Sequence, residues 1–206
     1  GPNGAGKSTL IKAIAGIVPV SAGAIRFSGN DITHMRPDYM AARGISYIPQ
    51  SDNIFRSLTV RQNLDLALRR EGRSIATRFQ ELLMQFPVLA DKLDDKAGAL
   101  SGGQRQFLAV AMALATKPHL LLMDEPSAGL SPKAAQEVLE LSRGLAETGV
   151  TVLLVEQNVN QALRIADHCF ILAEGQNQID GKATELLNNS VVSDIYLGGR
   201  RKRAGA

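Results

Sequence analysis

The sequence has one cysteine, no tryptophan and few aromatic residues. Cys169 has no partner in the chain, which excludes an internal disulfide and fits a reducing cytoplasm. It stands in an apolar run, and we interpret it as a buried small residue. No apolar run reaches the roughly 18 to 20 residues that a membrane-spanning helix needs, and no secretory signal is present at this start. If the protein serves a membrane process, we expect another chain to cross the bilayer.

Over most of the chain, basic residues do not outnumber acidic residues. The net charge is +3, but four of the 23 Lys and Arg residues lie at 200–203, which leaves 19 against 20 Asp and Glu residues. We therefore expect no nucleic-acid partner. The basic tail, residues 199–206, is interpreted as a solvated end, with weak attraction to an anionic membrane surface as the alternative.

The chain opens on a complete phosphate-binding loop of the G-x-x-x-x-G-K-[ST] type, followed by apolar residues at helical spacing. In such a loop, backbone N–H groups point at the phosphates, the lysine adds a cation, and the serine hydroxyl can ligate Mg²⁺. The helix N-terminus that follows strengthens the anion site. The sequence thus predicts a nucleoside triphosphate site formed by Gly1, Pro2, Asn3, Gly4, Ala5, Gly6, Lys7, Ser8 and Thr9.

A buried strand normally delivers a loop of this type, yet here the loop starts at residue 1. We expect that the sequence lacks the N-terminal part of its domain. The missing part would include the strand before the loop and a residue that stacks on adenine.

Strand patterns alternate with helix patterns along the chain, which predicts an α/β fold with a mainly parallel sheet. We expect strands at 24–27, 44–48, 120–123 and 150–155, helices at 7–15, 101–116 and 132–149, and a small antiparallel C-terminal hairpin around the turn at 174–175 with a final short helix. Helical spacing from Leu58 to about Leu93 predicts an inserted helical subdomain, about 58–100. Residues 1–206 are expected to form one domain.

Asp124 and Glu125 follow a continuous apolar strand, where an open α/β sheet places its ligand crevice. We expect Asp124 to hold Mg²⁺ and Glu125 to orient the water that attacks the γ-phosphate. Gln50 follows another strand, and its amide could contact both the metal and the water. ATP and Mg²⁺ are therefore the expected ligands, and Ser8, Gln50 and Asp124 are the candidate metal ligands.

The sequence Leu100-Ser-Gly-Gly-Gln104 separates this chain from other phosphate-loop NTPases. Ser101 and Gln104 form a capping box before an apolar helix, and Gly102 and Gly103 leave N–H groups bare at its positive end. An ordinary helix cap explains the same residues. However, the phosphate loop, Gln50, LSGGQ and Asp-Glu occur in this order along the chain, and their occurrence together favours a second phosphate site over an ordinary cap.

With these motifs, the chain resembles the ATP-binding cassette (ABC) family over essentially its whole length. Two cassettes of that family pair head to tail, and the LSGGQ of one closes on ATP held by the other. The resemblance implies that Ser101, Gly102, Gly103 and Gln104 act across a dimer interface. It also implies that Gln50 is the glutamine-loop residue and that the helical subdomain receives a coupling helix from a membrane subunit.

Two positions depart from the family pattern. Ser131 stands in the loop similar to the D-loop, at the place where an aspartate is usual. Gln157 stands where a switch histidine usually contacts the γ-phosphate, and an amide cannot become cationic. The resemblance makes Gln157 a second catalytic candidate. Our hypothesis is that Glu125 carries catalysis and that Gln157 senses phosphate.

Four phrases resemble the cassette of branched-chain amino acid importers: Ile48-Pro-Gln50, Leu58-Thr-Val60, Val155-Glu-Gln-Asn158 and Tyr196-Leu-Gly198. The resemblance implies an ATPase subunit at the inner face of the cell membrane, with a second cassette, permease subunits and, indirectly, a solute-binding protein as partners. Similar cassettes serve urea and short amides. One further alternative is a non-transport ABC ATPase of DNA repair, chromosome organisation or translation. Another is a catalytically dead regulatory cassette, but the intact Lys7, Asp124 and Glu125 argue against it.

Overall fold

The computed structural model describes residues 1–69 and 75–187. Three parallel strands form its central sheet, in the order β3 (Ile45–Ile48), β4 (Leu120–Asp124) and β5 (Thr151–Val155). Every residue of β4 is buried, as expected for the middle strand of a parallel sheet covered on both faces. Asp124 is level with Val155 in the register, so both strands end at the same edge of the sheet.

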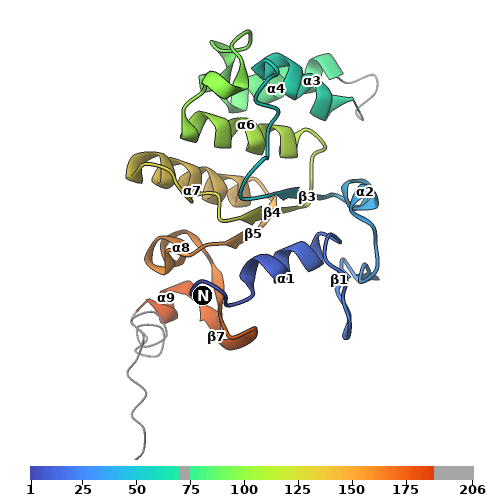
Figure 1. Ribbon diagram of the computed structural model, residues 1–206, viewed down its shortest axis with the longest axis vertical. Helices are drawn as coiled ribbons and strands as arrows, with labels where there is room; N and C mark the ends of the chain where they lie inside the picture. Colours follow the sequence, from blue (N-terminus) through green and yellow to red (C-terminus); the bar gives the residue numbers. More distant parts are fainter. Residues whose placement is uncertain (70–74, 188–206) are drawn as a thin grey trace, which may run out of the picture.

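Alternate residues of β4 face two different cores, because successive side chains of a strand point to opposite faces. Leu121 and Met123 pack with α6 (Gly102–Leu114) and α7 (Pro132–Glu147), whereas Leu120 and Leu122 pack with α1 (Lys7–Ile14). Figure 1 shows this layering, with α6 and α7 on one side of the sheet and α1 and α8 (Val159–Ile165) on the other. The α/β fold with a parallel sheet is therefore confirmed.

A helical region lies against α6, on the side away from the sheet (Figure 1). It consists of α3 (Val60–Leu68), α4 (Ile75–Gln85), α5 (Pro87–Ala90) and the 3₁₀ turn η3 (Ala97–Ala99). Arg78 of α4 donates hydrogen bonds to the carbonyl oxygens of Leu114, at 2.5 Å, and Ala115, at 3.4 Å. These bonds satisfy carbonyls that the end of α6 would otherwise leave unpaired. The C-terminal end of α6 is thus fixed to α4.

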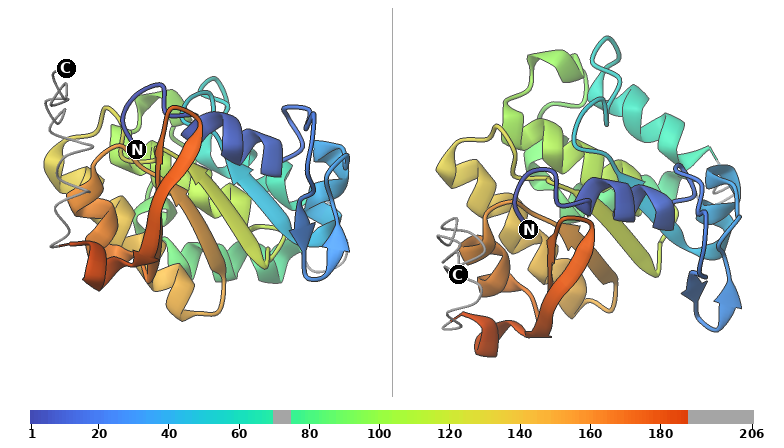
Figure 2. Two further views of the ribbon diagram at one scale, coloured as in Figure 1. Left: turned by 90° about the horizontal axis from the view of Figure 1, so that it is seen from below. Right: turned by 60° about the horizontal axis from the view of Figure 1, so that its bottom comes forward.

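The C-terminal hairpin is confirmed and is longer than the sequence indicated. It consists of β6 (His168–Ala173) and β7 (Gln176–Lys182), followed by α9 (Ala183–Leu186). Figure 2 shows the hairpin beside the N-terminal loop, and Gly175 N–H donates to the Ala5 carbonyl at 3.2 Å.

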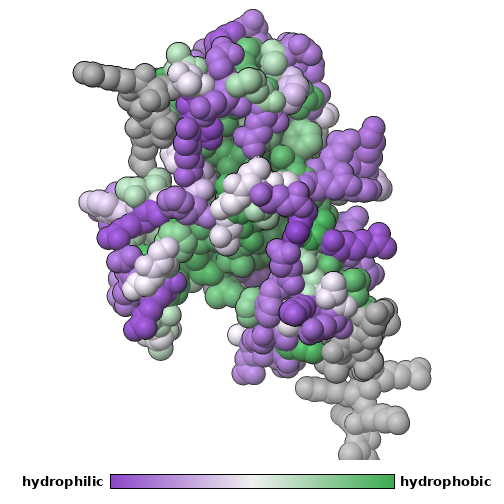
Figure 3. Space-filling model, turned by 180° about the vertical axis from the view of Figure 1, so that it is seen from behind, coloured by the Kyte–Doolittle hydropathy of each residue, from purple (hydrophilic) through white to green (hydrophobic). Residues whose placement is uncertain are grey.

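A cavity of about 570 Å³ lies between the hairpin and the sheet, lined mainly by apolar residues of α1, β5, α8 and β6. Figure 3 shows hydrophobic side chains gathered in the middle of the face opposite to that of Figure 1.

Several smaller elements were not expected from the sequence. The helices α8 and α2 (Pro37–Met40), the 3₁₀ turn η1 (Ala41–Arg43) and the two-residue strand β2 (Asn30–Asp31) are among them. The strand expected at 24–27 is reduced to β1 (Arg26–Phe27), which pairs with β2. The sequence also predicts a helix break at Gly72. This position, the Tyr196-Leu-Gly198 phrase and the basic tail 199–206 lie outside the described residues. Within residues 1–69 and 75–187, no helix has the length and apolar character needed to cross a bilayer.

Candidate functional site

The phosphate-binding loop leads directly into α1. Gly6, the residue that caps α1, has a φ of 90°, and Gly4 has a φ of 76°, both in the left-handed region where glycine alone carries no steric cost. No side chain caps this helix, so its first N–H groups remain available to an anion. Lys7 Nζ donates to the Pro2 carbonyl at 3.1 Å across the loop.

The carboxylate of Asp124 lies at the other side of this site, at the end of β4, and is only 2% exposed. Ser8 Oγ donates to Asp124 Oδ1 at 2.8 Å, and the hydroxyl of Tyr47 donates to Oδ2 at 3.4 Å. Burial, with the charge of Asp124 as a second cause, raises the pKa of Tyr47 to about 12. Tyr47 therefore remains a protonated donor at neutral pH.

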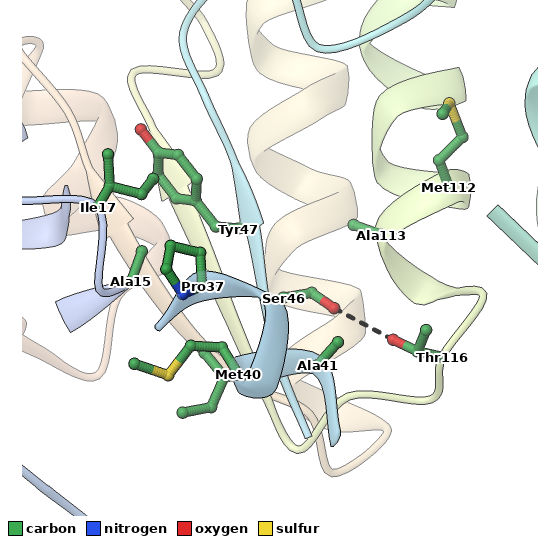
Figure 4. A pocket seen from close by; sticks show the side chains of 11 residues that line it. Ala15, Ile17, Pro37, Met40, Ala41, Ser46, Tyr47, Met112, Ala113 and Thr116 are labelled. Atoms are coloured by element: carbon green, nitrogen blue, oxygen red, sulfur yellow. Dashed lines mark hydrogen bonds between the residues drawn. The ribbon is translucent and has the colours of Figure 1, made fainter. Parts of the chain in front are cut away.

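Tyr47 also lines a cavity of about 260 Å³, together with residues of α2 and of the segment after α1. Figure 4 shows Tyr47 and Ser46 pointing to opposite sides of β3, with Ser46 Oγ bonded to Thr116 Oγ1 at 3.3 Å. The alternation is the ordinary period of a strand. It directs Tyr47 toward α1 and Ser46 toward α6.

Glu125 lies between the phosphate loop and Gln50. Its carboxylate is 3.5 Å from Lys7 Nζ, and Gln50 Nε2 donates to it at 3.1 Å. Its φ of 46° is in the left-handed region, which is unfavourable for a residue with a side chain. The N–H of Glu125 donates to the Val155 carbonyl at 2.9 Å. The structure thus brings Lys7, Gln50 and Glu125 together, as the strand ends predicted.

Gln157 reaches the phosphate loop from the end of β5. Its Nε2 donates to Asn3 Oδ1 at 2.6 Å. The preceding residue, Glu156, is 8% exposed, and burial raises its pKa. Its oxygens accept from the N–H groups of Ser127, at 3.1 Å, and Gln157, at 3.3 Å.

The capping box at the start of α6 is confirmed. Ser101 Oγ accepts from the Gln104 N–H at 3.2 Å, and Gln104 Oε1 accepts from the Ser101 N–H at 2.9 Å. A β-carbon added at Gly102 would lie 2.9 Å from Leu130 Cδ2, and one added at Gly103 would lie 3.1 Å from the β-carbon of Ala134. Among the described residues, no hydrogen bond or ion pair joins 101–104 to the phosphate loop of the same chain.

The donor set at the end of β4 fits Mg²⁺. The described residues contain no cluster of three His, Cys, Asp or Glu side chains that could hold a metal, but the hydroxyl of Ser8 and the carboxylate of Asp124 lie 2.8 Å apart. Magnesium commonly takes one or two protein oxygens and completes its shell with water and substrate phosphates. Gln50 hydrogen-bonds to Glu125 rather than to this pair.

Comparison with known proteins identifies the family. The family model described as ABC transporter matches residues 1–128. The chain belongs to the ABC transporter family. Members of this family hydrolyse ATP, and the Walker motifs that belong to the fold correspond to the phosphate loop and to the end of β4.

Two curated relatives and two solved structures illustrate the range of similar cassettes. The chain is 42% identical to the probable branched-chain amino acid transport ATP-binding protein LivF of Archaeoglobus fulgidus, over 96% of this chain and 85% of LivF. It is 37% identical to the lipopolysaccharide export protein LptB of Escherichia coli K12, over 96% and 83%. The ADP conformation of a solved cassette superposes with a TM-score of 0.85 at 30% identity, covering 96% and 85%. A dimeric cassette in a post-hydrolysis state with ADP and Pi gives 0.75 at 27% identity, covering 88% and 82%.

Sequence reasoning missed three contacts of this cassette. It did not single out the Tyr47–Asp124 bond, the Glu156–Ser127 bond, or the bond from Asn53 Nδ2 to the buried Gln106 Oε1 at 3.1 Å. Tyr47 and Glu156 carry a usable signal, because each stands beside the carboxyl end of a strand that the sequence predicted. Asn53 and Gln106 carry none, since 53 residues separate them.

Proposed function

We propose that this cassette is the ATP-hydrolysing subunit of a membrane importer. The observation that carries the ATP-hydrolysing role is the position of Glu125, between Lys7 and Gln50 and next in sequence to the Ser8–Asp124 pair. A carboxylate in this place can accept a proton from an attacking water while Lys7 holds the phosphates. We place the single domain at residues 1–206, with the helical subdomain at about 58–100.

Each part of the site has one task in this proposal. The N–H groups of the loop 1–9 and Lys7 bind the phosphates of ATP, and Ser8 and Asp124 would hold Mg²⁺, with Gln50 able to approach it when the site closes. The ion, when bound, neutralises charge on the phosphate oxygens. Glu125 orients and deprotonates the water. Gln157 donates a hydrogen bond toward the γ-phosphate and reports its presence to the rest of the chain.

We further propose that two cassettes enclose each ATP. In the part of the chain that the structure describes, no hydrogen bond or ion pair joins Ser101, Gly102, Gly103 and Gln104 to their own phosphate loop, and these residues present the positive end of α6 and its N–H groups. A second cassette brings these groups to the phosphates. The existence of a dimeric solved cassette with ADP and Pi supports this arrangement.

The substrate we propose is a branched-chain amino acid, on the similarity to LivF. LptB, whose name assigns it to lipopolysaccharide export, is nearly as similar, so the cargo rests on the likeness alone. Transporters of urea or short amides remain an alternative within the family. We place the protein on the cytoplasmic face of the membrane, with permease subunits that bind the helical region and a solute-binding protein that delivers the cargo.

Reconstitution tests the proposal. The protein is assembled with candidate permease subunits in proteoliposomes, and ATP-dependent uptake of labelled leucine is measured with and without a solute-binding protein. Uptake that disappears in Glu125→Gln supports the import function. ATP turnover that is stimulated by DNA or ribosomes instead would support the non-transport alternative.

A further inference from the structure

Glu156 is a buried acidic residue that the proposed chemistry does not use. It directly follows β5 and is 8% exposed. A carboxylate at this depth is stable only when its oxygens are hydrogen-bonded. Both oxygens are: Oε1 accepts from the N–H of Ser127 and Oε2 from the N–H of Gln157.

These bonds join two chain segments at the point where the sheet ends. The last bond between them before Glu156 runs from the Glu125 N–H to the Val155 carbonyl. Beyond this bond, the N–H groups of Ser127 and Gln157 both donate to Glu156, and they have no other acceptor among the described residues. The carboxylate of Glu156 therefore holds the two segments together where backbone pairing has stopped.

Ser127 begins a short loop, residues 127–131, that packs on the start of α6. Within the loop, Leu130 N–H donates to the Ser127 carbonyl at 3.3 Å. The side chain of Leu130 lies so close to Gly102 that a β-carbon there would be 2.9 Å from Leu130 Cδ2. A displacement of Ser127 is therefore transmitted to the LSGGQ end of α6, because close-packed groups cannot move independently.

On its other side, Glu156 meets the phosphate loop through Gln157. The side chain of Gln157 binds Asn3, while its N–H binds Glu156. We propose that Glu156 is a positioning residue that couples the phosphate-binding loop to the LSGGQ end of α6 within one chain. The proposal rests on the function given above. If two cassettes enclose each ATP, the phosphate loop and the LSGGQ sequence of one chain belong to two different ATP sites, and Glu156 links these two sites.

The chemistry of the contact requires a carboxylate. Two N–H donors face the side chain, and an ionised carboxylate has an acceptor oxygen for each. Glutamine at this place has only one acceptor oxygen, and its NH₂ group would face the second donor. Aspartate keeps both oxygens on a side chain that is one methylene shorter, so it can retain one of the two bonds.

Amide hydrogen exchange of the nucleotide-free protein tests the contact itself. In Glu156→Gln, we expect the amides of Ser127, Gln157 and Leu130 to exchange at least about tenfold faster, because lost hydrogen bonds lower local protection. The matched control is Glu137→Gln, which removes an exposed carboxylate of α7 and should leave these rates unchanged. In Glu156→Asp, which also serves if Glu156→Gln does not fold, we expect faster exchange at one of the two bonded amides. Unchanged exchange in the variant that folds would overturn the proposal.

ATP-driven pairing of cassettes tests the coupling. In a hydrolysis-deficient Glu125→Gln background, we expect Glu156→Gln and Gln157→Ala each to weaken pairing about tenfold, and the double variant to weaken it no further, because both break one connection. In a Ser101→Arg background, in which pairing is blocked, Glu156→Gln should leave ATP affinity unchanged, because Glu156 contacts Ser127 and Gln157 through their N–H groups. An additive loss of about a hundredfold would exclude coupling through Glu156. If the parent shows no ATP-driven pairing, the proposed function fails, and the exchange experiment alone decides the role of Glu156.

Discussion

Among single residues, Glu125 has the clearest predicted role, because its carboxylate meets both Lys7 and Gln50. In Glu125→Gln, we expect ATP turnover to fall by about a hundredfold to a thousandfold, since general-base catalysis contributes that order of rate. ATP binding should persist. Steady-state phosphate release and equilibrium nucleotide binding measure the two effects. Glu137→Gln on the exposed face of α7 is the control, and turnover within a few-fold of the parent in Glu125→Gln would refute the assignment.

Gln157 should matter less for the chemical step than Glu125. Its amide is a neutral donor, and a hydrogen bond to a charged phosphate contributes about 1.5–3 kcal/mol, of which only the part gained in the transition state changes the rate. We therefore expect Gln157→Ala to keep turnover within about tenfold of the parent. Phosphate release at saturating ATP measures it. A loss as large as that of Glu125→Gln would show that Gln157 takes part in catalysis.

Much of the residue-level site follows from the sequence. Asp124, Glu125 and Gln50 stand just after apolar strand patterns, and parallel strands bring their carboxyl ends to one edge. The sequence places Tyr47 near the end of a predicted strand, but its contact with Asp124 also requires that β3 lie directly beside β4, which only the structure shows. The position of Ser131 is likewise explained only by the structure: its hydroxyl accepts from Ala134 N–H at 3.4 Å and caps α7.

At the scale of elements, the close approach of α6 to the start of α7 depends on two glycines. We expect Gly103→Val to destabilise the protein by about 1–3 kcal/mol, because the added side chain would press on Ala134 and overpacking costs that order of energy. Gly144→Ala in α7 is the matched control: an added β-carbon there has no neighbour within 4 Å, and helix propensity predicts a gain of about 1 kcal/mol. Urea unfolding measures both, and equal stability of the two variants would contradict the prediction.

Helix α3 is connected to the segment after Gln50 by one buried side chain. Asn63 is fully buried; its Oδ1 accepts from the Phe55 N–H, and its Nδ2 donates to the carbonyls of Phe55 and Thr59. We expect Asn63→Leu to cost about 1–3 kcal/mol, because the Phe55 N–H loses its acceptor, whereas the Phe55 carbonyl keeps the bond from the Leu58 N–H at 3.1 Å. Urea unfolding measures the loss, and a cost below 1 kcal/mol would mean that water replaces the amide.

The sequence predicts long elements better than short ones. The helices α6 and α7 and the strand β4 carry sustained apolar patterns, and the structure confirms them. The helix α8 was missed because its seven residues are few and only Leu163 is buried, so its apolar period is weak. The helix α2 has four residues, and its form depends on packing against the rest of the chain.

At the scale of the whole molecule, the proposed function depends on pairing of two cassettes. Ser101→Arg places a long cationic side chain at the start of α6, where a second cassette would approach. We expect it to abolish ATP-driven pairing and to reduce turnover to the level of Glu125→Gln. Size-exclusion chromatography with light scattering measures pairing. Normal pairing and turnover in this variant would refute the sandwich arrangement and, with it, the importer proposal.

The two fixed ends of α6 have a mechanical consequence. Arg78 holds the C-terminal carbonyls of this helix to α4, and at its other end Gly102 and Gly103 lie so close to Leu130 and Ala134 that an added β-carbon would crowd them. A helix of 13 residues is a stiff rod about 20 Å long. A displacement of α4 is therefore carried along α6 to Leu130 and Ala134, so that this helix mechanically links the outer helical region to the loop before α7.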